Sequence, residues 1–144
     1  MTEKSGKKLV LVAAAALFDE QSRILLAQRP PGKTMAGLWE FPGGKIEKNE
    51  TPESALIREL SEELAVTVNK SQLIPLHFVS HNYPDFHLMM VLYACHEWEG
   101  SPAAVEGQNL QWVKPDDLHT YDAPAADIPL FEFISSGRYR EPRT

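Results

Sequence analysis

The sequence predicts an α+β fold in which a β-sheet is covered by helices on both faces. Two observations lead to this prediction: several short, β-rich apolar runs follow one another, and only residues 51–64 and 128–135 form main helices. The 144 residues contain no internal repeat or low-complexity tract, and this length lets one domain bury about two-thirds of its unfolded surface. We therefore expect a single domain over residues 1–144, with a core of about 8–135.

The first third of the chain predicts a hairpin followed by a turn. Residues 9–18 form an apolar run, 19–22 supply turn residues and 23–29 form a second strand. The Pro-Pro-Gly-Lys segment at 30–33 breaks the pattern, and 35–41 leads into a Pro-Gly-Gly turn.

The helix at 51–64 has clear start signals. Thr51 can cap it, Pro52 suits its first position, and Glu53 complements the N-terminal dipole. Its apolar side repeats at i, i+4 and i+8, with Leu56, Leu60 and Leu64. One side of this helix should be buried, and the other should face a site.

The second half of the chain predicts the remaining strands and a closing helix. Residues 73–79, 87–98 and 110–113 are expected as strands, before the helix at 128–135. The single cysteine, Cys95, rules out an internal disulfide and is expected to be a buried strand residue without a chemical role.

Composition and charge narrow the function classes. A net charge of −6 argues against a general DNA-binding surface, which needs clustered Lys and Arg. The apolar run at 9–18 is too short to span a membrane, and Lys7-Lys8 before it lacks the cleavage-site context of a signal peptide. We expect a cytoplasmic protein with no membrane contact, no stable nucleic-acid binding, and loose tails at 1–7 and 137–144.

Three carboxylates share one face of the helix at 51–64. Glu59, Glu62 and Glu63 stand at i, i+3 and i+4, within a single turn. Like charges at this spacing destabilise a helix by roughly 0.2–0.5 kcal/mol per pair, and a divalent cation with oxygen ligands would turn that repulsion into attraction. The alternative is a solvated acidic face with Arg58 as its local counter-charge.

The spacing around this face decides between the two interpretations. Gly44 is followed after five residues by Glu50, after seven more by Arg58-Glu59-Leu60, and then by Ser-Glu-Glu-Leu-Ala-Val at 61–66. This pattern resembles the Nudix box of the nucleoside diphosphate-linked hydrolases. It departs at Ala65, where the box has glycine and where a helix commonly ends in a left-handed residue. Alanine there would cost about 1 kcal/mol if its φ is positive, but no ligand is lost.

The resemblance implies the Nudix fold, an α/β/α sandwich with a mixed β-sheet. Within that family the chain is most similar to the mutator-T type of small nucleoside triphosphate pyrophosphohydrolase, which removes 8-oxo-dGTP from the nucleotide pool. The likeness runs from about residue 8 to residue 134. Outside the box it rests on weaker segments whose order along the chain gives them weight: 25–30, 39–45, 83–85, 98–100, 106–108 and 124–127.

The resemblance also implies a metal site. Water attacks the phosphorus of a triphosphate slowly until cations neutralise its oxygens, and Mg²⁺ suits this task, with Mn²⁺ as a possible substitute. Similarity to the family assigns as metal ligands the Gly43 carbonyl and the carboxylates of Glu59, Glu62, Glu63 and Glu106. The number of ions is left open. An exposed loop acid is the alternative for Glu106.

The remaining box residues receive catalytic or supporting roles. Either Glu59 or Glu106 acts as the general base, and the sequence does not separate them. Arg58 holds the glutamates by charge-assisted hydrogen bonds, and Gly44 belongs to the box turn. Glu50 either supports Arg58 from the loop or binds a second ion.

Positive charge is expected near the acids to bind phosphate. Resemblance favours Arg29 and Lys45, whereas Lys33 could equally be a solvated loop lysine. Across the mutator-T enzymes, attack falls on the β-phosphorus and releases nucleoside monophosphate and pyrophosphate.

Base recognition is expected to involve Asp127, Tyr83 and Asp85. Asp127 takes the place of an asparagine that reads oxidised guanine, and an ionised carboxylate can only accept a hydrogen bond, such as one from the N7–H that oxidation creates. The alternative makes Asp127 a helix cap alone, before Ile128-Pro129. Phe86 stands where the bacterial pattern has a nucleotide-contacting arginine.

These departures keep other functions open. Residues 126–130 also resemble the related CTP pyrophosphohydrolases, which act on cytidine and oxidised pyrimidine triphosphates. Residues 83–85 and 106–108 favour the oxidised purine. A non-catalytic nucleotide-sensing module should have lost a box carboxylate, and none is missing. The sequence does not fix the oligomeric state; a monomer is our expectation.

Overall fold

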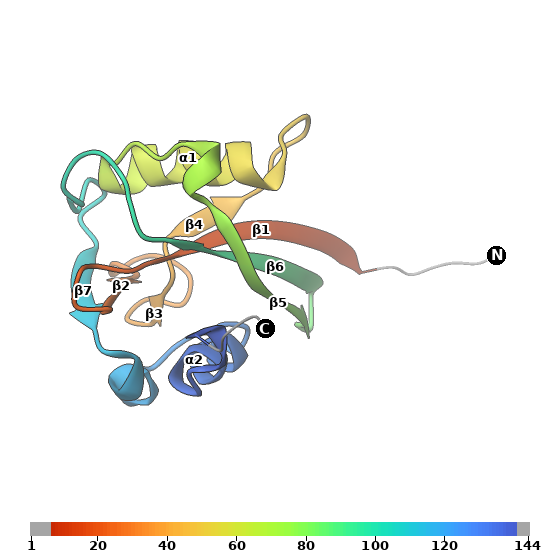
Figure 1. The fold of residues 1–144 in the computed structure, drawn as a ribbon. Helices are drawn as coiled ribbons and strands as arrows, with labels where there is room; N and C mark the ends of the chain where they lie inside the picture. The colour runs from red at the N-terminus through yellow and green to blue at the C-terminus, as the bar shows by residue number, and fades with distance from the viewer. Residues whose placement is uncertain (1–6, 141–144) are drawn as a thin grey trace.

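The computed structural model describes residues 7–140, which form two β-sheets flanked by helices (Figure 1). The larger sheet has the strand order β4-β1-β6-β5, made by Gly43–Lys45, Lys8–Leu17, Phe86–Cys95 and Ile74–Asn82. The smaller sheet has the order β3-β2-β7, made by Trp39–Glu40, Ile24–Gln28 and Asn109–Val113. β1 runs parallel to β6 but antiparallel to β4, so the larger sheet is mixed, as predicted.

Helix α1 (Pro52–Leu64) and helix α2 (Ile128–Ser135) lie on opposite sides of the larger sheet (Figure 1). The α+β prediction and both helix positions are therefore confirmed. Within residues 7–140, short 3₁₀ helices lie at Lys70–Gln72, Pro115–Thr120 and Arg138–Arg140.

The predicted hairpin between the first two strands is wrong. β1 and β2 meet only at an isolated bridge between Phe18 and Ile24, and each strand then enters a different sheet. β1 is buried on both faces at its C-terminal end, from Ala13 to Leu17, because helices cover both sides of the sheet there. A strand buried on both faces suits the parallel pairing with β6 better than a two-stranded ribbon.

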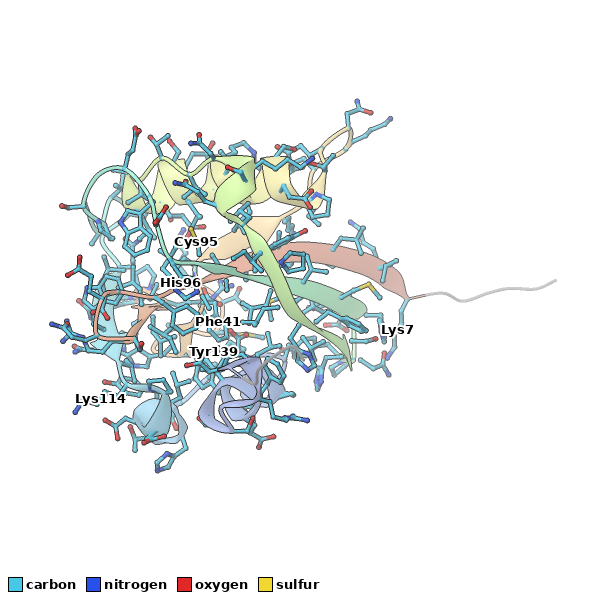
Figure 2. The ribbon with its side chains drawn as sticks, in the orientation of Figure 1. Lys7, Phe41, Cys95, His96, Lys114 and Tyr139 are labelled. Atoms are coloured by element: carbon cyan, nitrogen blue, oxygen red, sulfur yellow. The ribbon has the colours of Figure 1, made fainter. Side chains whose placement is uncertain are left out.

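Two apolar cores hold these layers together. Under α1, Leu56, Leu60 and Leu64 pack with the odd-numbered residues of β1, such as Ala13 and Ala15. On the other face, the even-numbered residues of β1 pack with α2. Phe41 joins this second core and lies in the interior of the molecule, edge-on to Phe131 with ring centroids 5.3 Å apart (Figure 2). Cys95 is buried in the strand β6, as expected.

The predicted tails are shorter than expected. Lys7 donates hydrogen bonds to the Asn82 side chain and the Tyr83 carbonyl, both at 2.9 Å. Near the other end, Tyr139, labelled in Figure 2, stacks on Phe18 with ring centroids 5.3 Å apart, so this part of the predicted tail packs against the domain. The outer parts of the predicted tails, 1–6 and 141–144, lie outside the described residues. No helix within residues 7–140 has the length and apolar character needed to cross a membrane.

Candidate active site

Local sequence signals fix both ends of α1. Thr51 Oγ1 accepts a hydrogen bond from the Ser54 N–H, and Ser54 Oγ accepts one from the Thr51 N–H, each at 3.0 Å. Ala65 ends the helix in the left-handed region, with φ 59° and ψ 34°. The chain therefore adopts at Ala65 the positive φ that glycine would adopt at lower cost.

Two glycines bring β4 against the acidic face of α1. A Cβ on Gly44 would overlap the carboxylate of Glu59, and a Cβ on Gly43 would overlap the backbone of Ala13 in the neighbouring strand. Only glycine leaves room for the Glu59 carboxylate to lie over this turn. Gly44 is thus required by a close approach, which the box pattern alone does not reveal.

Arg58 gathers the glutamates around it. Its Nε and Nη2 donate to the two carboxylate oxygens of Glu50 at 2.7 and 3.0 Å, and its Nη1 donates to Glu59 at 3.2 Å and to Glu62 at 3.4 Å. The hydrogen bond from Arg58 lowers the pKa of Glu50 to about 2. Glu50 is therefore ionised throughout the neutral range and holds Arg58 in place.

Glu63 lies at the most crowded point of the acid cluster. Burial raises its pKa to about 9, helped by a hydrogen bond to Glu59 and by the charges of Glu59 and Glu106, and only the Gly43 N–H opposes this. Carboxylates that share a site raise one another's pKa, and a bound cation would reverse that effect. Oxygen donors with uncompensated negative charge are the donor set that Mg²⁺ takes, so these residues fit a hard divalent ion.

The metal-ligand prediction stays untested by the geometry. Glu63, Glu106 and Gly43 line one small cavity, whereas the Glu62 side chain is 57% exposed and turned to Arg58. Within the described part of the chain, acidic, His and Cys side chains do not converge in threes at the spacing of a formed metal site.

A buried amide positions the loop that carries Glu106. Gln108 Nε2 donates to the Glu63 carbonyl at 3.0 Å, and Gln108 Oε1 accepts from the Glu106 N–H at 2.9 Å. Val105 N–H adds a bond to the same Glu63 carbonyl at 3.3 Å. The loop is therefore tied to the end of α1, which brings Glu106 to the acids. Gln108 is only 8% exposed, and the sequence analysis assigned it no role of its own.

Two cavities adjoin at the centre of the site. The larger, of about 210 Å³, is mostly apolar and reaches Asp127, whereas the smaller, of about 150 Å³, holds Glu63 and Glu106. Arg29, Glu40 and Gly43 line both. One cavity thus offers apolar walls and the other offers charge, and they meet at a shared wall.

The three basic residues considered for phosphate binding do not all line the same cavity. Arg29 lies at the junction, with its Nε 3.1 Å from Glu40 Oε2. Lys33 lines the smaller cavity beside the acids, whereas Lys45 lines the larger one. Lys33 is exposed, but it lines the same cavity as Glu63 and Glu106, which a purely solvated loop lysine would not have to do.

Asp127 lines the larger cavity, and its side chain makes no hydrogen bond of the kind that the alternative, a helix cap alone, requires. Its side chain is 4% exposed and accepts from the Phe41 N–H at 3.3 Å, and it makes no capping hydrogen bond to α2. Its backbone is already helical, with φ −79° and ψ −23°, so the carboxyl points away from the first turn. Burial, reinforced by the charge of Glu40, raises the pKa of Asp127 to about 8.

The aromatic wall of the larger cavity comes from Tyr83 and Phe86. Their rings stack with centroids 5.0 Å apart, and the Tyr83 hydroxyl accepts from the Ala126 N–H at 3.1 Å. Asp85 between them is exposed and is not among the residues that line either cavity. The structure therefore brings Tyr83 to the cavity but not Asp85, because the tip of the β5–β6 turn points its polar residue to solvent.

Sequence reasoning missed Glu40 and Met35, which both line the larger cavity. Glu40 stands between two aromatic residues, Trp39 and Phe41, and an acid in such an apolar segment was the available signal. Met35 has a positive φ of 62°, and nothing in its sequence context indicates that.

Comparisons with known proteins agree with this geometry. A family model described as NUDIX domain matches residues 13–133. The chain is 42% identical over 101 residues to the 8-oxo-dGTP diphosphatase of Proteus vulgaris, covering 70% of this chain and 88% of that protein. It is 36% identical over 135 residues to the CTP pyrophosphohydrolase of Escherichia coli K12, covering 92% of this chain and 97% of that protein.

A solved structure of a MutT protein, from work on Aliivibrio salmonicida and Vibrio cholerae, matches with a TM-score of 0.77 and 31% identity, covering 90% of this chain and 99% of that one. The resemblance read from the box is thus confirmed at the level of both sequence and fold. Because the family model spans most of the chain and both curated relatives are more than a third identical to it over the aligned residues, the protein belongs to the NUDIX domain family, as a hydrolase of the mutator-T type.

Proposed function

We propose that the protein is a Mg²⁺-dependent nucleoside triphosphate pyrophosphohydrolase that converts 8-oxo-dGTP and water to 8-oxo-dGMP and pyrophosphate. This reaction would keep an oxidised base out of newly replicated DNA. The observation that carries the proposal is the pair of adjoining cavities, one acidic and one apolar, that share Arg29 as a wall. A nucleotide has the same division, with an anionic end and a flat base whose faces are apolar.

The acidic cavity is the proposed centre of hydrolysis. Glu59, Glu62, Glu63, Glu106 and the Gly43 carbonyl would hold Mg²⁺, or Mn²⁺ in its place, and the bound ion would neutralise phosphate charge and orient water. Glu59 is already engaged by Arg58 and Glu63, whereas Glu106 faces the cavity, which favours Glu106 as the general base. General-base help is worth about 10²–10⁴-fold.

Arg29 is the proposed contact for phosphate at the junction, with Lys33 and Lys45 on either side of it. This arrangement places positive charge along the path from the base to the acids. Attack at the β-phosphorus would leave pyrophosphate in the acidic cavity and the monophosphate on the side of the base.

Asp127 is the proposed reader of the base. With a pKa of about 8 it keeps its proton at neutral pH, and a neutral carboxyl offers both a donor and an acceptor. Oxidised guanine presents N7–H beside the O6 carbonyl, which matches that pair. Ordinary guanine presents two acceptors, N7 and O6, so the carboxyl oxygen that does not carry the proton would meet a lone pair.

A CTP pyrophosphohydrolase is the second candidate, and the same carboxyl supports it. Cytosine presents the N4 amino donor beside the N3 acceptor, which also matches a neutral carboxyl. The aromatic pair of Tyr83 and Phe86 could stack on either base.

A turnover panel tests the proposal. The protein with Mg²⁺ is given 8-oxo-dGTP, dGTP, CTP and 5-hydroxy-CTP, and kcat/KM is compared. The proposal expects 8-oxo-dGTP to exceed dGTP by at least an order of magnitude and to exceed both pyrimidines. A lead for CTP or 5-hydroxy-CTP would replace it with the second candidate, and absence of turnover on all four would favour a nucleotide-sensing module. The proposed site lies within one chain, so we take a cytoplasmic monomer without stable nucleic-acid contacts as the working form.

A further inference from the structure

We propose that Tyr83 is a positioning residue for base recognition: its hydroxyl holds the Ala126 N–H and thereby fixes the place of the Asp127 carboxyl in the larger cavity. The inference rests on the proposed function, in which Asp127 reads the base. It gives the Tyr83 hydroxyl a role that stacking of the ring on a base does not require.

The hydrogen bond between Tyr83 and Ala126 joins two segments that lie 43 positions apart in the sequence. Tyr83 lies in the turn between β5 and β6, and Ala126 lies in the loop before α2. Both segments contribute walls to the larger cavity, the turn through its aromatic pair and the loop through Pro124 and Asp127. The bond therefore sets the distance between two walls of the proposed base site.

Tyr83 is anchored by contacts that do not involve its hydroxyl. Its carbonyl accepts from Lys7 Nζ and its N–H donates to the Phe86 carbonyl, both at 2.9 Å. Its ring stacks on Phe86 and meets the His81 ring at 63°, with centroids 4.5 Å apart. Replacement by phenylalanine should therefore keep the ring in place and remove only the bond to Ala126.

The Asp127 carboxyl has little support of its own. Within residues 7–140 its side chain accepts a single hydrogen bond, from the Phe41 N–H, and at 3.3 Å that bond is long. The place of the carboxyl therefore follows from the Asp127 backbone, which donates to the Pro124 carbonyl and accepts from the Phe131 N–H, both at 2.9 Å.

Ala126 sets the start of that backbone segment. It is fully buried and directly precedes Asp127, and its N–H donates to the Tyr83 hydroxyl at 3.1 Å. A buried N–H without an acceptor is unfavourable, so removal of the hydroxyl should let the peptide before Asp127 shift towards another partner. The Asp127 carboxyl would move with it.

Such a shift should affect base reading more than hydrolysis. A hydrogen bond to the base needs the Asp127 carboxyl at the right distance and angle. The acids of the smaller cavity are held by other contacts, from Arg58 and Gln108. Loss of the Tyr83 hydroxyl should therefore weaken binding of the preferred base, while the hydrolytic step keeps its geometry.

A double-mutant cycle tests this assignment. With Mg²⁺ present, kcat and KM for 8-oxo-dGTP and dGTP are measured in the wild type, Tyr83→Phe, Asp127→Ala and the double variant. Tyr83→Phe should lower the preference for 8-oxo-dGTP about fivefold or more, mainly through a higher KM, which lies within the range of energies that couple residues of one hydrogen-bond network. In the Asp127→Ala background the same change should alter the preference by less than about twofold, because Tyr83 acts through Asp127. Tyr121→Phe makes the same chemical change at a tyrosine that lines neither cavity of the site, and it should leave the preference unchanged.

Amide hydrogen exchange checks the bond itself without a nucleotide. The Ala126 N–H should be protected in the wild type and should exchange about tenfold faster or more in Tyr83→Phe, because its acceptor is lost. The melting temperature of each variant shows that it is folded.

Three results would each overturn the positioning role of Tyr83. They are equal exchange of the Ala126 N–H in both proteins, a full preference for 8-oxo-dGTP in Tyr83→Phe, and an additive loss in the double variant, which would indicate direct contact of the hydroxyl with the base. Any of them in an enzyme that prefers 8-oxo-dGTP removes this inference alone. A wild type without that preference, or without turnover, removes the proposed function and the inference together.

Discussion

The Gln108 side chain donates to the Glu63 carbonyl at 3.0 Å and thereby fastens the 103–108 loop to the last turn of α1. The contact joins two parts of the site that lie 45 positions apart in sequence, the box helix and the loop of Glu106. The Gln108 side chain is buried, and both of its hydrogen bonds are partly shielded from water. The geometry of the acidic cavity therefore depends on a neutral residue that carries out no chemistry.

Gln108→Ala should loosen that loop. The change leaves the Glu106 N–H without its partner and the Glu63 carbonyl with only the 3.3 Å bond from the Val105 N–H, at a cost of roughly 1–3 kcal/mol. We expect a lower melting temperature and a kcat reduced at least tenfold at saturating Mg²⁺, since Glu106 loses its position. Gln111→Ala, on the exposed side of β7, serves as the control and should change neither. A full kcat in Gln108→Ala would show that Glu106 does not depend on this tie.

Glu63→Gln should remove activity without harming the fold. The amide is a poorer ligand and carries no charge, so we expect kcat to fall by several orders of magnitude at saturating Mg²⁺. The raised pKa of Glu63 also gives a stability test. In metal-free wild type, stability should decline as pH rises from about 5 towards 9, because the folded state resists losing the Glu63 proton more than the unfolded chain does.

Glu63→Gln should reduce that decline, leaving the share that the raised pKa of Asp127 contributes, and Mg²⁺ should reduce it in the wild type. Thermal melts from pH 5 to 9 with and without Mg²⁺ would measure both effects. Glu53→Gln, on the first turn of the same helix, should keep turnover. Near-normal turnover of Glu63→Gln in excess Mg²⁺ would rule out Glu63 as a metal ligand.

Hydrolysis in heavy-oxygen water should label pyrophosphate and leave the nucleoside monophosphate unlabelled. This result follows from attack on the β-phosphorus, and mass spectrometry of the two products measures it. Label in the monophosphate would instead indicate attack at the α-phosphorus, and release of orthophosphate would contradict both assignments.

The preference for 8-oxo-dGTP over dGTP should fall as pH rises through about 8, because Asp127 then loses the proton that it donates. Asp127→Asn keeps a donor and an acceptor that do not titrate, so its preference should persist above pH 8. Asp127→Ala should collapse the preference at every pH. The ratio of kcat/KM values for the two substrates, measured from pH 6 to 9.5, is the readout. If Asp127→Asn follows the wild-type curve, another group sets the profile.

Ala65→Gly should stabilise the protein by up to about 1 kcal/mol, because Ala65 holds a φ of 59° that glycine adopts without steric cost. The matched control is Ala55→Gly in the interior of the same helix, which should destabilise by about 1 kcal/mol or more. Chemical denaturation of both variants gives the comparison. A lower stability of Ala65→Gly would mean that the entropy glycine adds to the unfolded chain outweighs the relief of strain.

The box helix could be predicted from sequence because its signals are local. Thr51, Pro52 and the leucine spacing fix it, and the left-handed end at Ala65 follows from the box pattern. Pairings between distant segments carry no such signal. The parallel contact of β1 with β6 joins residues about 78 positions apart, as in Lys8 opposite Phe86, and the sequence analysis placed β1 with β2 instead.

The candidate site shows the same difference between residues with local sequence signals and residues that depend on distant segments. The glutamates could be named from their spacing, although their roles stay predictions. Glu40 and the protonated state of Asp127 could not be predicted, because each depends on burial created by other segments. Asp127 in isolation is a good helix cap by composition, but in the fold its carboxyl accepts a hydrogen bond from the Phe41 N–H, 86 positions away in sequence.

The strand β1 supplies no charged group to either cavity, yet it should tolerate few amino-acid substitutions during evolution. Ala13 and Ala14 are buried and pair with Gly44 and Gly43, so the glycine turn rests directly on them. A larger side chain at either alanine would have to displace α1 or the opposite core, since close-packed interiors absorb added methylenes poorly. Variation among descendants of this chain should therefore concentrate in its exposed loops, while a strand without chemistry stays almost fixed.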